Sequence, residues 1–159
     1  MASPASHLSP YASSLLTFSP FAIEVHMYGS NRYKQNHMNT AQPGDLVVML
    51  YDGIVRFVTN AAKACEDNDP ANTGYSITRA LDIIAYLQAI LRSDVAPELA
   101  GRLDDAYSSW STALVKSNIN RDPEAMREIL DQVQGLRDAW NEANEMVKSG
   151  EAKDTTAAA

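Results

Sequence analysis

The side chains that most often carry enzyme chemistry are few in this chain, and their spacing does not suit a catalytic or metal site. His7, His26 and His37 all precede the first expected helix and show no metal-ligand spacing. No Glu-x-x-His pair occurs, which excludes the di-iron type of helical bundle on motif grounds. The single cysteine, Cys65, excludes an intramolecular disulfide and a cysteine-based zinc site.

The remaining polar residues also give little support to an enzyme. Glu124, Glu128, Asp131 and Asp138 fall on the solvated face of the last expected helix, where charges usually serve solubility. The glycines of the helical region are isolated, so they form no phosphate-binding loop. We therefore expect no catalytic residues, no cofactor and no metal.

Composition limits the classes of partner. The chain has 159 residues, 45% of them apolar, and a net charge of −7. This length suits one domain with a substantial core. The acidic balance argues against nucleic acid as a partner, because phosphate binding needs a surplus of Lys and Arg. No apolar run approaches the ~20 residues that span a bilayer, and there is a single cysteine, so we expect a soluble domain of a reducing compartment with no membrane insertion.

The two ends of the chain differ from its middle. Residues 1–26 contain no Lys or Arg and only one acid, Glu24, so they lack the basic start of a secretory signal. We interpret 1–27 as a flexible or non-native extension, with Met27 as the natural start. Residues 148–159 are small and polar and are expected to be a disordered tail. The domain then covers 28–147.

Apolar periodicity and helix-boundary residues predict four helices. Prolines suit the first helical position at Pro43, Pro97 and Pro123, and Asp122 suits an N-cap. The expected helices cover about 43–66, 71–92, 97–119 and 123–147. No useful stretch alternates with period two. The pattern predicts an all-α fold, an antiparallel up-down-up-down four-helix bundle with a short N-terminal cap segment.

The first expected helix is apolar around well over half of its circumference, more than a bundle helix needs. The second carries an extra apolar line, formed by Ile83, Tyr86 and Ile90, beside its core stripe. One interpretation is that the first helix is simply the most buried. The other is that part of its surface receives a segment of a partner. The two are compatible if residues 28–42 cover the groove until a partner displaces them.

Five short motifs, in order along the chain, resemble the flagellin export chaperones of the FliS family. The first two are NRYKQN at 31–36 and NTAQPGDLVVMLYDG at 39–53. The third is the Arg-Ala-x-x-Ile-Ile-x-x-Leu pattern at 79–87. The last two are LVKSN followed by NRD within 114–122, and Asp-Ala-Trp at 138–140. Each motif is weak alone, but the collinear set is specific.

The resemblance implies a cytosolic bundle that holds the C-terminal segment of flagellin in apolar grooves. Such a protein prevents premature polymerisation and delivers its client to the flagellar type III export gate, without nucleotide or metal. A homodimeric helical scaffold or adaptor that uses the same surface is the alternative. Contacts with other flagellar regulators, and a monomer or a weak homodimer, stay open.

The expected flagellin-binding residues fall into two groups. Tyr33 and Met38 form the displaceable cover that the resemblance implies. The groove lining is expected from the broad apolar surfaces of the first two helices. The expected lining residues are Val47, Tyr51, Val55, Ile83, Tyr86 and Ile90. For each of them, ordinary packing in the core is the competing interpretation.

Overall fold

The computed structural model describes residues 43–150, and this part of the chain is four helices with no strand. The helices are α4 (Pro43–Glu66), α5 (Pro70–Ala89), α6 (Pro97–Asn120) and α7 (Pro123–Ser149). The predicted all-α bundle is confirmed. The expected extension at 1–27, Tyr33 and Met38 lie outside the described residues.

Helix boundaries follow the local sequence closely. Asp69 and Asp122 cap α5 and α7, each accepting a hydrogen bond of 3.0 Å from a backbone N–H three residues later. A proline then occupies the first turn of each helix. Helix α5 ends at Ala89, earlier than the periodicity predicts, and α7 continues to Ser149, two residues later than expected.

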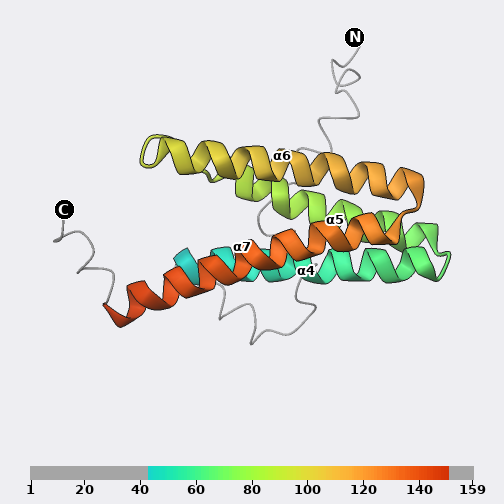
Figure 1. Cartoon of the computed structure of the whole chain (residues 1–159), viewed down its shortest axis with the longest axis horizontal. Helices are drawn as coiled ribbons and strands as arrows, with labels where there is room; N and C mark the ends of the chain where they lie inside the picture. The colour runs from blue at the N-terminus through green and yellow to red at the C-terminus, as the bar shows by residue number, and fades with distance from the viewer. Residues whose placement is uncertain (1–42, 151–159) are drawn as a thin grey trace, which may run out of the picture. The chain divides into compact units, whose positions relative to one another are not determined.

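The helices form a closed ring in which each packs on the next and α7 returns to α4 (Figure 1). Short connections at 67–69 and 121–122 make the joined helices antiparallel. All four contribute side chains with no exposed surface to one core. These include Ile54 and Val58 of α4, Ala80 and Ile84 of α5, Leu114 of α6, and Met126 and Val133 of α7.

Polar links between helices fix the closure of α7 on α4. Arg137 of α7 donates to the carboxylate of Asp52 in α4 at 3.0 Å, and Arg127 pairs with Glu66 at the other end of the same interface. Most of these side chains are partly exposed, so each pair adds little to stability. They set the register of the first helix against the last.

Residues 43–150 contain neither a membrane-spanning helix nor a cluster of metal-ligating side chains. No helix there is long and apolar enough to cross a membrane. Within the same range, no three His, Cys, Asp or Glu side chains are grouped so that they could hold a metal ion.

Candidate binding groove

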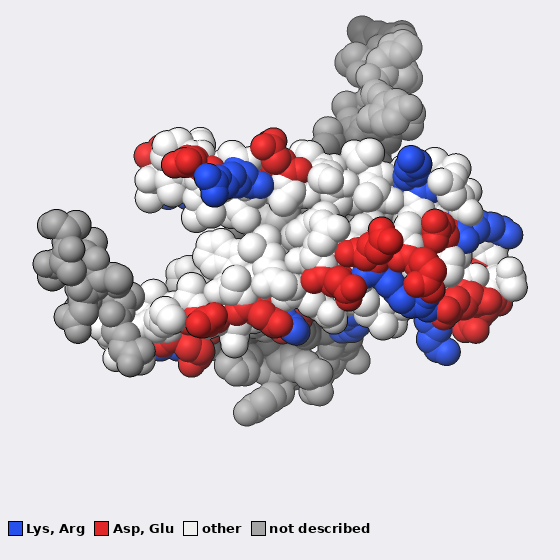
Figure 2. Space-filling view, viewed as in Figure 1, with Lys and Arg blue, Asp and Glu red and all other residues white. Residues whose placement is uncertain are grey.

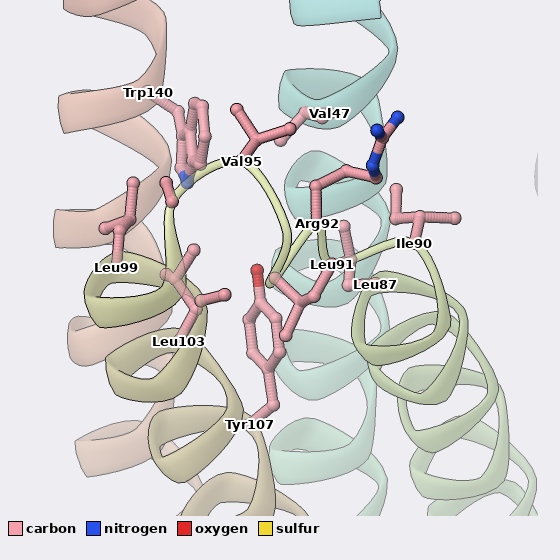
Figure 3. Close-up of a pocket in the computed structure, with 12 residues that line it drawn as sticks. Val47, Leu87, Ile90, Leu91, Arg92, Val95, Leu99, Leu103, Tyr107 and Trp140 are labelled. Atoms are coloured by element: carbon pink, nitrogen blue, oxygen red, sulfur yellow. The ribbon is translucent and has the colours of Figure 1, made fainter.

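An apolar groove of about 210 Å³ opens at the end of the bundle where α5 ends and α6 begins. We call it the end groove. Figure 2 shows the molecule hollowed on this side between α6 and α7, with mostly uncharged surface inside the hollow. Figure 3 shows the side chains that surround it. They are Val47, Leu87, Ile90, Leu91, Arg92, Val95, Ala96, Leu99, Ala100, Leu103, Tyr107 and Trp140.

The connection between α5 and α6 builds one wall of the end groove. This connection, 90–96, is the longest of the three, and it carries apolar side chains into the turn. Val95 is 70% exposed there, and Leu99 in the first turn of α6 is 51% exposed. Arranged this way, apolar surface lies open to solvent beside the core, which is the usual mark of a binding site.

The one charged side chain of the end groove is already paired. Arg92 donates from Nε and from a terminal nitrogen to the carboxylate of Asp94, at 2.8 and 2.7 Å. This hydrogen bonding raises the pKa of Arg92 and lowers the pKa of Asp94. The groove therefore presents no uncompensated charge from its lining, and it suits an apolar segment.

Tyr107 forms the floor of the end groove, and a second buried tyrosine, Tyr51, lies behind it. The hydroxyl groups of Tyr51 and Tyr107 lie 2.5 Å apart, and the Tyr107 ring packs against Trp110 at a centroid distance of 5.7 Å. Trp110 is held in turn by Gln132, which accepts from its indole N–H at 3.0 Å. Burial raises the pKa of both tyrosines, so both hydroxyls stay protonated at neutral pH. The floor is a packed and hydrogen-bonded surface.

A second depression of about 740 Å³ lies between the start of α4 and the last turns of α7. Trp140 lines both this depression and the end groove, so the two hollows adjoin across one indole. Asp45 of α4 holds two side chains that line the second depression. Its carboxylate accepts hydrogen bonds from Asn144 at 2.7 Å and from Lys148 at 2.6 Å. The hydrogen bond with Asp45 raises the pKa of Lys148.

Only two of the described residues that the sequence places in the groove line the hollows described above. Val47 and Ile90 lie in the end groove, and Ile90 is 40% exposed. Tyr51 has no exposed surface and lies behind Tyr107, and Ile83 is buried in the core at 1% exposure.

The other expected lining residues, Val55 and Tyr86, are half-buried and line neither the end groove nor the second depression. The expected cover residues Tyr33 and Met38 lie outside the described residues.

Sequence reasoning missed most of the groove-lining residues. Leu99, Leu103, Tyr107 and Trp140 follow the core stripes of α6 and α7, and periodicity assigns them all to the core. One residue could have indicated the groove from the sequence. Val95 is apolar although it lies in a turn, outside the helices whose periodic apolar faces form the core.

Comparison with known proteins assigns the chain to a family. The family model described as "Flagellar protein FliS" matches residues 26–147. A flagellar secretion chaperone FliS from Bacillus subtilis is 35% identical over 111 residues, which cover 70% of this chain and 82% of the relative. Its namesake from Escherichia coli is 30% identical over 105 residues, 65% of this chain and 77% of the relative. The family match covers the end groove and nearly all of the helical bundle, and the chain therefore belongs to the FliS family of flagellar proteins.

Proposed function

We propose that this chain is a cytosolic flagellar export chaperone that binds the C-terminal segment of flagellin. In this proposal the bound segment cannot polymerise prematurely, and the complex is delivered to the flagellar type III export gate. The observation that carries the proposal is the end groove. Its lining is apolar except for one arginine, which is paired with an aspartate, and Val95 and Leu99 are exposed at its edge. Curated relatives named flagellar secretion chaperone support the client class.

The groove has the energetics that holding an unfolded segment requires. Each half-exposed Leu or Val that a client covers contributes roughly 1 kcal/mol from apolar burial. Tyr107 on the groove floor is buried and packed against Trp110, so it does not have to become ordered on binding, which lowers the entropic cost for the chaperone. A client that also crosses Trp140 reaches the second depression and extends the contact toward α4.

Residues 28–42 are the proposed cover of this surface, with Tyr33 and Met38 as its apolar contacts. The position of Pro43 supports this assignment, because Pro43 is the first residue of α4 and lines the second depression beside Trp140. The segment that precedes it therefore joins the helix next to the proposed client surface. Val47, Tyr51, Val55, Ile83, Tyr86 and Ile90 stay the proposed contacts from α4 and α5, with Tyr51 and Ile83 acting from behind the surface.

Calorimetric titration with a synthetic peptide from the C-terminus of the flagellin of the same organism tests the function. We expect saturable binding with a negative heat-capacity change, the signature of apolar burial. Circular dichroism on the same sample verifies that the bundle is folded. A folded protein that does not bind the peptide would refute the proposal. Light scattering tests the scaffold alternative, which a stable dimer that the peptide cannot dissociate would favour.

A further inference from the structure

The end groove contains a tyrosine hydroxyl that has a single hydrogen-bond partner among the described residues. Tyr107 is 2% exposed, and its hydroxyl contacts the hydroxyl of Tyr51 at 2.5 Å. No other hydrogen bond of the Tyr107 side chain occurs within 43–150. Figure 3 shows this hydroxyl pointing into the space that the groove residues surround.

The acceptors available to Tyr51 determine which of the two tyrosine hydroxyls donates the hydrogen bond. Tyr51 has no exposed surface, and its other polar neighbour is the indole N–H of Trp140, which can only donate. The proton of Tyr51 therefore has one available acceptor, the oxygen of Tyr107. Once Tyr107 accepts that proton, its own proton must point elsewhere, and the open side is the groove.

We propose that the Tyr107 hydroxyl is a specificity-determining contact that donates a hydrogen bond to a neutral oxygen acceptor of the bound client segment. This inference rests on the proposed function. Tyr51 is a positioning residue in this arrangement, because it occupies the acceptor side of Tyr107 and leaves the donor side for the client.

The surroundings of the hydroxyl define the acceptor. The lining around it is apolar apart from Arg92, and Arg92 is paired with Asp94, so a client carboxylate would be desolvated without compensation. A carbonyl in the middle of a helix is already used by its own helix. The acceptor is therefore a main-chain carbonyl in an extended stretch or in the last turn of a client helix, the amide oxygen of Asn or Gln, or a side-chain hydroxyl oxygen.

Two matched variants separate this contact from the structural role of the tyrosine pair. Both Tyr107→Phe and Tyr51→Phe remove the hydrogen bond between the tyrosines, but only Tyr107→Phe removes the proton that faces the groove. The probe is the flagellin C-terminal peptide, titrated by calorimetry against the full chain. We expect Tyr107→Phe to weaken peptide binding about three- to tenfold, and Tyr51→Phe to weaken it by a clearly smaller factor, because Tyr51→Phe disturbs the position of the Tyr107 hydroxyl but keeps its proton.

Each outcome bears on one of the two proposals. Equal affinities for the two variants, whether reduced or unchanged, would overturn the Tyr107 contact while leaving the chaperone function intact. A wild-type chain that is folded and does not bind the peptide would overturn the function, and the contact with it.

A spectroscopic measurement keeps the proposal testable if either variant fails to fold. The Cζ carbon of a tyrosine senses hydrogen bonding at its hydroxyl, so the wild-type chain is labelled with ¹³C at that position. We expect the Tyr107 signal to shift on peptide addition by more than the signal of Tyr75, which lies outside the groove. A Tyr107 signal that does not move at saturation would overturn the proposal.

Discussion

The hydroxyl groups of Tyr51 and Tyr107 meet at 2.5 Å inside the bundle, joining α4 to α6, two helices that are not neighbours in the ring. Most other contacts in the fold run between adjacent helices. This bond therefore connects opposite sides of the core directly beneath the end groove, and its chemistry affects both stability and binding.

Alkaline pH should destabilise the protein through these two tyrosines. Burial raises the pKa of both in the folded state, whereas an unfolded tyrosine ionises near about pH 10. The stabilisation is complete below that pH and is lost as the pH rises above it, by at most about 1.4 kcal/mol per pH unit for each group. Urea unfolding at a series of pH values between about pH 9 and pH 11 measures this slope.

Two tyrosine variants serve as controls for the alkaline prediction. The double variant Tyr51→Phe and Tyr107→Phe should lose most of the slope. Tyr75→Phe should keep it, because Tyr75 is 51% exposed. A slope that is the same in all three proteins would contradict the assignment.

Two glycines should respond in opposite directions to alanine. A Cβ at Gly44 would collide with the side-chain amide of Asn144, so that amide must leave Asp45, which loses one donor. We expect Gly44→Ala to lower the free energy of unfolding by about 1 kcal/mol. Gly135 in α7 has open space around it, and Gly135→Ala should raise stability by about 0.5–1 kcal/mol. Thermal unfolding compares the stability of the two variants. Equal gains in stability would refute the predicted collision between a Cβ at Gly44 and Asn144.

A charge placed in the end groove should weaken client binding without unfolding the bundle. Leu99 and Val115 both lie on α6 at 51% and 45% exposure, but only Leu99 lines the groove. We expect Leu99→Asp to weaken binding of the flagellin peptide by at least about tenfold, since the carboxylate must be desolvated. Val115→Asp is the matched control and should stay within about twofold. Similar losses in both variants would place the client elsewhere.

The two parts of the N-terminal region should behave differently in the same titration. Deleting residues 1–26 should leave peptide affinity unchanged, because only the last of these residues falls within the family match at 26–147. Replacing Tyr33 and Met38 together by Ala should strengthen binding, since a weaker cover leaves more of the chain competent to bind. A loss of binding on deletion of 1–26 would show that this segment belongs to the working protein.

Helix boundaries could be predicted from sequence because they are local. Asp122 and Pro123 determine the start of α7 through one capping bond and one fixed dihedral angle, and both are visible in the sequence. The four-helix class followed from the same signals together with apolar periodicity.

The groove could not be predicted in the same way, because exposure depends on which helix stands opposite. Leu99 and Leu103 share one stripe of α6, yet they are 51% and 7% exposed. The prediction for Tyr51 failed in the opposite direction. The wide apolar arc of α4 suggested a surface position for Tyr51, but Tyr51 packs against Tyr107 and has no exposed surface. Periodicity identifies an apolar face but not whether another element covers it.

The closure of α7 on α4 has a consequence for how the working protein is made. Val47 of the first described helix and Trp140 of the last both line the end groove. A ribosome releases α4 first and α7 last, so a chain still being synthesised has only part of the groove walls. The groove is complete only after translation has passed residue 140, because a shorter chain lacks the wall that Trp140 supplies.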